Sequence, residues 1–211
     1  MQRLFALLFL GILVTLQPTR AHGADDIRTL VADFDAFNRA QDPVRAAQRG
    51  DAAAARIWPD NSPAAVAARR AALQQFERRL QALPGAGLGE EDALNRDLLL
   101  GRVRLALDGF QFDEERLNFI SGDGFYTTAD YAALNTPLDG PADAENWIAR
   151  LEALPAYYER EMANLRRGIQ TGFTQPRRTV ERAIEDVRGQ LAQPVATTPL
   201  LAPFRNVSPS F

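Results

Sequence analysis

The sequence contains no cysteine, and its single histidine is His22, close to the N-terminus. Without cysteine the chain forms no disulfide, so its stability must come from packing. One histidine at this position excludes Ser–His–Asp and Cys–His catalysis in the residues that follow, and also a His-ligated zinc or iron site. Carboxylates, tyrosine, arginine, serine, threonine and asparagine are therefore the side chains left for chemistry.

Lysine is also absent, because all 24 basic residues are arginine. Acidic residues outnumber them, and the formal net charge is −3. No basic face is evident along the sequence, so a nucleic-acid partner is not expected.

The first 24 residues have the features of a secretory signal peptide. The charged start Met1–Arg3 precedes an apolar run of 13 residues, Leu4–Leu16, and small residues follow. We expect cleavage near Ala21 or Ala24, a periplasmic or secreted protein, and no stable membrane insertion afterwards, because the run is short for a membrane span. An uncleaved N-terminal anchor is the alternative.

Apolar residues recur at helical spacing in the rest of the chain, without useful β alternation. The sequence therefore predicts an all-α fold over 25–196, with about six amphipathic helices in an irregular bundle. Pro155 predicts a break near Ala153, because proline lacks the backbone donor and clashes one turn back. The expected helices are 25–42, a short one within 43–58, 63–83, 90–109, 142–171 and 176–193.

The same spacing predicts which side chains are buried. A broad apolar arc in 90–109 indicates that this helix is central in the bundle. In 142–171, Tyr158 lies on the apolar stripe, whereas Tyr157 lies off it and faces a cleft or water. The last two helices are expected to bury Trp147, Leu151, Leu154, Tyr158, Met162, Leu165, Ile169, Val180, Ala183, Ile184, Val187 and Leu191.

Glycine and proline make residues 110–141 the least regular segment. Leu117–Ile120 fits either a short strand or a helical turn. Ser121–Phe125 is favoured as a plain turn over a cleft-lining loop. Asp113–Glu115 is expected at a helix start, where the helix dipole favours carboxylates.

Two arginines, Arg177 and Arg178, fall in the first turn of the last helix, which Thr174 is expected to cap. The helix dipole disfavours cations there, so one of them is expected to bind a carboxylate of the protein or, less favoured, of a ligand.

The segment 197–211 is irregular and apolar, with prolines at 199, 203 and 209. We interpret it as a connection towards a missing C-terminal catalytic region. Its apolar side chains are Leu200, Leu201, Phe204, Val207 and Phe211.

Several stretches carry a family resemblance: "NRDLLL", "LNFISG", "RLEALPAYYEREMANLRRGIQTGFTQPRRTVE" and "PLLAPF". From about Asp26 to Phe204 the chain resembles the N-terminal part of the bacterial family called domain of unknown function 885. The resemblance implies a predominantly helical zinc metallopeptidase of the gluzincin type. In such proteins an H-E-x-x-H helix in the second half supplies two zinc ligands and a general base.

No position after Ala24 matches that motif, so no catalytic residue, metal ligand or cofactor is expected in this chain. Zinc is expected only in a full-length relative. The stretches "LNFISG" and "PRR" match regions expected to line the substrate cleft, which makes Asn118, Ser121, Gly122 and Arg177 the candidate site residues.

The resulting hypothesis is the scaffold and cleft-wall portion of an exported zinc-dependent peptidase, truncated before its catalytic half and inactive by itself. Its partner would be a peptide substrate or that half. The alternative is a stand-alone periplasmic binding or interaction protein. It predicts that Leu200, Leu201, Phe204 and Phe211 pack on the core. A non-metal enzyme using carboxylates and tyrosine is a third interpretation, for which no constellation is present.

Overall fold

A computed structural model describes residues 20–84, 87–205 and 207. The all-α prediction is confirmed, because apart from two two-residue strands the regular elements of these residues are helices. In chain order the elements are α1 (Arg20–Gln41), α2 (Pro43–Gln48), η1 (Ala54–Arg56), α3 (Pro63–Ala82), α4 (Glu90–Gly109), η2 (Glu114–Leu117), β1 (Phe119–Ile120), β2 (Asp123–Gly124), α5 (Phe125–Leu134), α6 (Pro141–Glu152), α7 (Leu154–Thr171), α8 (Arg177–Ala192), η3 (Val195–Thr197), η4 (Pro199–Leu201) and α9 (Ala202–Arg205).

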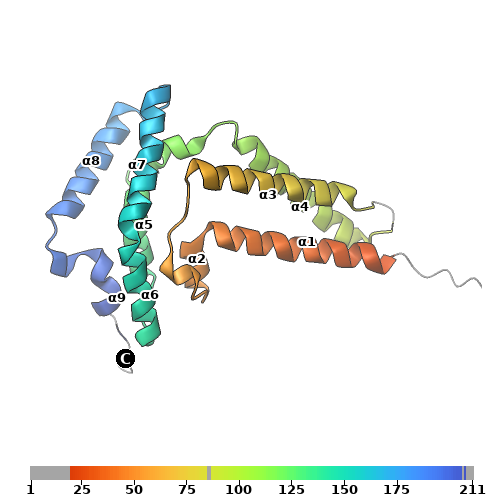
Figure 1. Cartoon of the computed structure of the whole chain (residues 1–211), viewed down its shortest axis with the longest axis horizontal. Coiled ribbons are helices and arrows are strands. Elements are labelled where there is room, and N and C mark those ends of the chain that lie inside the picture. The colour runs from red at the N-terminus through yellow and green to blue at the C-terminus, as the bar shows by residue number, and fades with distance from the viewer. Residues whose placement is uncertain (1–19, 85–86, 206, 208–211) are drawn as a thin grey trace, which may run out of the picture.

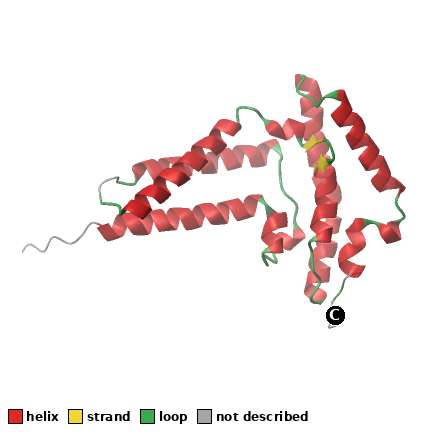
Figure 2. Ribbon diagram, turned by 180° about the vertical axis from the view of Figure 1, so that it is seen from behind, coloured by secondary structure: helices red, strands yellow, loops and turns green. Residues whose placement is uncertain are grey.

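The helices form two groups (Figure 1). The arm consists of the long helices α1, α3 and α4, which lie side by side. The lobe consists of α5 to α9, and its longest helix, α7, runs across the end of the arm. Figure 2 shows the two short strands beside α7, in the segment that leads from α4 into the lobe.

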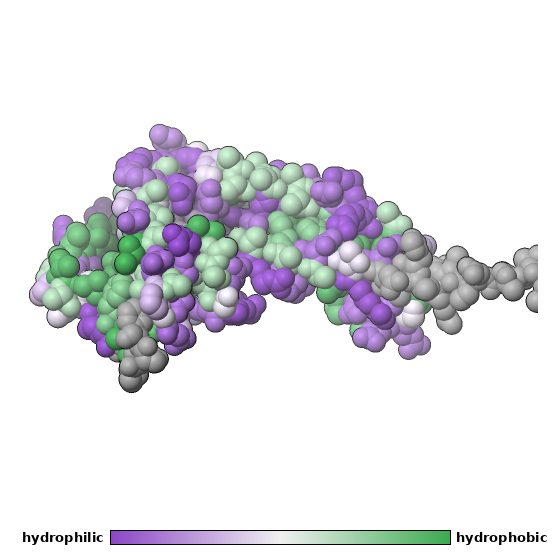
Figure 3. Space-filling view, turned by 60° about the horizontal axis from the view of Figure 1, so that its bottom comes forward, coloured by the Kyte–Doolittle hydropathy of each residue, from purple (hydrophilic) through white to green (hydrophobic). Residues whose placement is uncertain are grey.

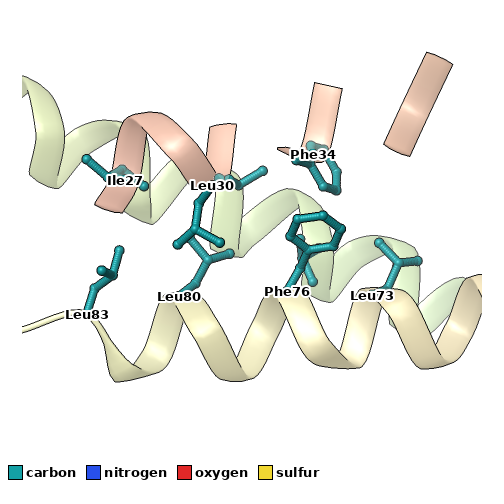
Figure 4. Packing of buried hydrophobic residues seen from close by; sticks show 9 residues of the cluster. Ile27, Leu30, Phe34, Leu73, Phe76, Leu80 and Leu83 are labelled. Atoms are coloured by element: carbon teal, nitrogen blue, oxygen red, sulfur yellow. The ribbon is translucent and has the colours of Figure 1, made fainter. Parts of the chain in front are cut away.

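The arm has its own hydrophobic core, in which side chains of α1 point towards those of α3 (Figure 4). Phe34 and Phe76 meet edge to face, with ring centroids 5.3 Å apart. Ser62 begins α3 as predicted, because its hydroxyl accepts a hydrogen bond from the Ala65 amide. The buried residues of this core are Ile27, Leu30, Phe34, Leu73, Phe76, Leu80, Leu83, Leu99 and Val103.

The predicted central position of 90–109 is wrong. Helix α4 buries Leu99 and Val103 against α1 and α3, but Leu98 and Leu105 are 59% and 74% exposed. A broad apolar arc requires neighbours on several sides, and α4 has them on one side only.

The predicted break near Ala153 is confirmed. Helix α6 ends at Glu152 and α7 begins at Leu154, which places Pro155 in the first turn, where its missing donor costs little. Because the helix restarts there, its buried face is not the predicted one. The buried residues of α7 are Leu154, Tyr157, Glu161, Asn164 and Gly168.

Tyr157 is thus buried and does not face bulk water, while Tyr158 is only partly buried and Ile169 is 70% exposed. After Leu154, each buried position of α7 lies one residue before the position predicted from the apolar stripe. The reason is that the buried face includes two polar residues, Glu161 and Asn164.

Helix α8 packs against Phe119 and Tyr126 through one narrow face. Ala183 is buried and Val180 and Val187 pack against the same cluster, whereas Ile184 and Leu191 are 44% and 81% exposed. The predicted cap at Thr174 is also wrong, because Pro176 occupies the N-cap position. Figure 3 shows hydrophobic side chains gathered at the end of the molecule that carries α8 and α9.

Residues 195–205 are folded onto the lobe as short helical turns. The Trp147 indole donates a hydrogen bond to the Leu200 carbonyl at 3.0 Å. Leu200 and Phe204 pack against the cluster around Trp147, and Pro203 is buried. Phe211 lies outside the described residues.

At the other end, α1 begins at Arg20, so it runs across both predicted cleavage positions, Ala21 and Ala24. Residues 1–19 of the predicted signal peptide lie outside the described residues. None of the helices in the described part of the chain has the length and hydropathy needed to cross a bilayer.

Arg150 of α6 joins the lobe to the segment that follows α1. Its side chain is 1% exposed and donates to the carbonyls of Pro43, Ala54 and Ile57 at 3.1, 2.5 and 3.1 Å. The guanidinium lies 5.2 Å from the Trp58 ring centroid, and the Trp58 indole donates to the Arg150 carbonyl at 2.7 Å. Burial lowers the pKa of Arg150 to about 10, so the group stays charged at neutral pH.

We expect the Arg150→Met variant to lose about 3 kcal/mol or more of unfolding free energy, because buried carbonyls lose their charged donor. Urea denaturation followed by circular dichroism measures the change. Arg166→Met is the matched control, since Arg166 is 61% exposed on α7, and it should change stability by about 0.5 kcal/mol or less. Equal effects of the two variants would contradict a structural role for Arg150.

Candidate functional site

A pocket of about 410 Å³ lies between α7 and the segments before α3 and after α4. We call it the acidic pocket. Four carboxylate residues line it and no basic residue does. The residues that define it here are Asn61, Glu115, Asn118, Asp123, Tyr157 and Glu161.

Glu161 is the central group of the acidic pocket. It is 1% exposed, and each of its oxygens accepts an amide hydrogen: Oε1 from Asn61 Nδ2 at 3.0 Å and Oε2 from Asn118 Nδ2 at 2.6 Å. Asn118 Nδ2 also donates to the Glu161 backbone carbonyl at 3.0 Å. The buried carboxylate is therefore held in one orientation by two side chains that are distant in sequence.

Burial raises the pKa of Glu161 above its ordinary value of 4.5, and the nearby Glu115 raises it further. The two amides and Arg160 act in the opposite direction but do not cancel the effect of burial. Arg160 instead pairs with Asp60 at 3.6 Å, and none of the ion pairs within the described ranges includes Glu161. The carboxylate thus lacks a cationic partner in a place where an isolated charge is costly.

Tyr157 and Asn164 complete the buried polar face of α7. Burial strongly raises the pKa of Tyr157, so its hydroxyl stays protonated. Asn164 Nδ2 donates to the Asn61 carbonyl at 2.8 Å, which fixes the loop that carries the Asn61 amide. The floor of the pocket and the loop above it are therefore positioned by the same helix face.

The opposite wall depends on a close approach of η2 to α7 at Gly168. A Cβ atom there would lie 2.7 Å from the Phe173 carbonyl oxygen and 2.8 Å from that of Arg116. Arg116 also donates to Thr171 at 2.9 Å and lies 4.4 Å from the Phe173 ring centroid. Glycine at this position lets η2 place the following residue, Asn118, over Glu161.

Asp113 anchors the start of η2. Its φ angle of 48° is left-handed, and its carboxylate pairs with Arg167 at 2.8 Å and Arg116 at 3.0 Å. Asp113–Glu115 stand at a helix start as predicted, with Asp113 at the N-cap position of η2 and Glu114 and Glu115 in its first turn. Asp113 forms no side-chain cap bond and makes the two ion pairs instead.

The strand alternative for Leu117–Ile120 is correct for its second half, because Phe119 pairs with Gly124 and Ile120 with Asp123 in an antiparallel hairpin. Gly124 has a φ of 151°, and a Cβ there would lie 2.4 Å from the Phe119 Cβ. The hairpin thus requires glycine at the point where α5 begins.

The structure brings one of the four sequence candidates into the pocket. Asn118 lines it, whereas Ser121 and Gly122 form the exposed turn of the neighbouring hairpin. Arg177 is exposed at the start of α8 and does not line the pocket, and no ion pair of Arg177 or Arg178 is found within the described ranges.

Tyr157 lines the pocket, in agreement with the cleft alternative stated for it, and so do Asp123 and Phe125 of the segment for which a cleft-lining loop was the less favoured alternative. Asn61 and Glu161 were not predicted from the sequence.

The residues of the pocket do not fit the zinc ion that the resemblance implies. A zinc site needs three or four histidine, cysteine or carboxylate ligands gathered around one point. Among residues 20–84, 87–205 and 207, no group of three or more such side chains is placed to hold a metal ion.

Comparison with known families gives one match. The model of a family described as "bacterial protein of unknown function (DUF885)" matches residues 43–210. No curated protein and no solved structure matches the chain. The matched range includes every residue that defines the acidic pocket.

We expect Gly168→Ala to reduce the unfolding free energy by about 1–3 kcal/mol, because the new methyl group overlaps two backbone carbonyls. Gly189→Ala is the matched control: Gly189 lies in α8 with open space around it, so alanine should stabilise the helix by about 0.5–1 kcal/mol. Chemical denaturation of both variants measures the difference, and a stabilising Gly168→Ala would contradict the close approach of η2.

We expect Glu161→Gln to gain stability relative to the parent protein as pH rises. The raised pKa means that the folded parent binds a proton more tightly than the unfolded chain. The parent therefore loses stability as pH rises from about 4.5 through the folded pKa, and glutamine removes that loss.

Urea denaturation at pH 4.5 and pH 8 measures this difference. The Glu159→Gln variant reports the effect of the charge change alone, since Glu159 is 69% exposed on the same helix. A Glu161→Gln difference that does not grow with pH would contradict the burial of an ionised carboxylate.

Proposed function

Because this chain belongs to the DUF885 family, and resembles the N-terminal part of its peptidase-like members, we propose that it is the substrate-binding portion of an exported zinc-dependent peptidase. In this proposal the acidic pocket forms one wall of the peptide cleft. The chain binds and orients the peptide and does not hydrolyse it by itself.

The observation that carries the proposal is the buried Glu161 carboxylate in the wall of an open pocket. Folding such a group away from water without a cation lowers stability, so a purely structural role is a poor explanation. The volume of about 410 Å³ falls within the range of small-ligand pockets. Two stretches that carry the resemblance contribute to the pocket: "LNFISG", at 117–122, includes Asn118, and the stretch 150–181 includes Tyr157 and Glu161.

Asn61, Asn118 and Tyr157 supply hydrogen-bonding groups, and Phe125 supplies an apolar surface in the same wall. A peptide offers both kinds of group at close spacing, so this lining suits a peptide ligand. No catalytic step is assigned to these residues.

The alternative function is a stand-alone periplasmic binding or interaction protein. The observation that favours it is the packing of 199–205 on the lobe, where Leu200 and Phe204 are partly buried and Trp147 binds the Leu200 carbonyl. Both functions require ligand binding by the acidic pocket. They differ in whether a catalytic half acts on the bound ligand.

We expect the purified protein to bind fluorescently labelled peptides and to leave them uncleaved, with or without added zinc. Fluorescence anisotropy measures binding, and mass spectrometry of the same samples detects cleavage. Zinc-dependent cleavage would contradict the binding-only role, and an absence of binding to any peptide would contradict the cleft-wall role.

The intact mass of the protein in its own cells separates the two functions. A larger species that contains an H-E-x-x-H segment supports the peptidase. A mass equal to that of the chain without its signal peptide supports the stand-alone binding protein.

A further inference from the structure

We propose that the acidic pocket binds a primary ammonium group of a peptide, with Glu161 as its counter-ion. This inference rests on the proposed function, because it takes a peptide as the ligand. It names the group of the peptide that the pocket recognises.

The first argument is the charge of the lining. Glu114, Glu115, Asp123 and Glu161 contribute four carboxylates, and none of the arginines in the described part of the chain lines the pocket. Arg69 neutralises Glu115 only in part, at 3.8 Å. The pocket therefore attracts a cation.

The second argument is an unpaired acceptor beside the buried carboxylate. Asn118 Nδ2 is used by Glu161, but its Oδ1 atom is buried and has no hydrogen-bond partner. An unpaired buried acceptor is destabilising. A donor group that enters next to Glu161 would supply the missing partner of Oδ1 while Nδ2 keeps its hydrogen bond to Glu161.

The geometry favours an ammonium over a guanidinium. Arginine binds a carboxylate best through two parallel hydrogen bonds to both oxygens. Here the amides of Asn61 and Asn118 already occupy one position on each oxygen of Glu161. A compact ammonium, with three donors pointing in different directions, can use one remaining lone pair of Glu161 together with the Asn118 oxygen.

The aromatic residues of the pocket support the same ligand. Phe125 and Tyr157 line it, and aromatic faces attract cations. Because the described residues place no metal-binding group of carboxylates there, an organic cation is the partner that this lining accommodates.

A primary ammonium of a peptide comes either from the free N-terminus or from a lysine side chain. Three synthetic peptides distinguish these sources: tetra-alanine amide, its N-acetylated form, and an N-acetylated form in which one alanine is replaced by lysine. Isothermal titration calorimetry at pH 7 and low salt measures their affinities for the purified protein.

We expect the peptide with a free N-terminus to bind about tenfold more tightly than its N-acetylated form, a difference of about 1.4 kcal/mol. If the lysine peptide recovers the affinity, a lysine side chain is also accepted; if it does not, the site is specific for the N-terminal ammonium. Either result supports the proposal.

In the Glu161→Gln variant the preference for the charged peptides should disappear. Glu159→Gln, an exposed change on the same helix, should keep it. Far-ultraviolet circular dichroism checks that both variants are folded, and the comparison of the three peptides on the unmodified protein does not depend on any variant.

Equal affinity of all three peptides would overturn the ammonium inference and leave the proposed function standing. A preference that survives in Glu161→Gln would overturn the role of Glu161 as counter-ion. Absence of binding by all three peptides would overturn the inference together with the proposed peptide-binding function.

Discussion

The arrangement of the two helix groups depends on one buried guanidinium. Arg150 binds three backbone carbonyls from the segment between α1 and α3, and this segment leads directly into the loop that carries Asn61. Arg150 holds the start of this segment, and Asn164 and Glu161 of α7 hold its end through Asn61. The acidic pocket needs both this loop and α7, because the loop carries Asn61 and α7 carries Glu161. Arg150, which does not line the acidic pocket, thus helps to determine the shape of that pocket.

The same molecule shows two ways to hold a buried charge. Arg150 donates hydrogen bonds to three carbonyl oxygens, and its guanidinium also lies against the Trp58 ring. Glu161 receives two amide donors and remains near other carboxylates, which raises its pKa. The hydrogen bonds of Arg150 require no ligand, whereas Glu161 is in no ion pair of the described residues. On these physical grounds Arg150 is a structural group, and Glu161 is the group for which we propose a ligand.

Helical spacing predicted most of the long helices and the break near Ala153, because these depend on local sequence. It missed α5, which lies within the segment 110–141 that was expected to be irregular. It failed where the neighbours of a helix decide burial. The exposed Leu98 and Leu105 of α4 could not be anticipated, since the sequence does not say how many helices surround α4. Of the residues that define the pocket, the sequence indicated Asn118 as a site candidate and Tyr157 as a residue that faces a cleft or water. Glu161 was missed because a carboxylate among apolar positions looks like a solvent-facing residue, although its spacing with Tyr157, Asn164 and Gly168 is that of one helix face.

The break at Ala153 also limits how the chain can change in length. Each residue of an α-helix turns the chain by about 100°. An insertion of one residue between Pro155 and Glu161 would therefore rotate the carboxylate away from both amides, and Gly168 would no longer face η2. Substitutions on the outer side of α7 leave this register intact, but insertions and deletions in its first two turns do not. In descendants of this chain, variation in length should consequently accumulate in the loops between helices, while α7 keeps a fixed distance from its first proline to Gly168.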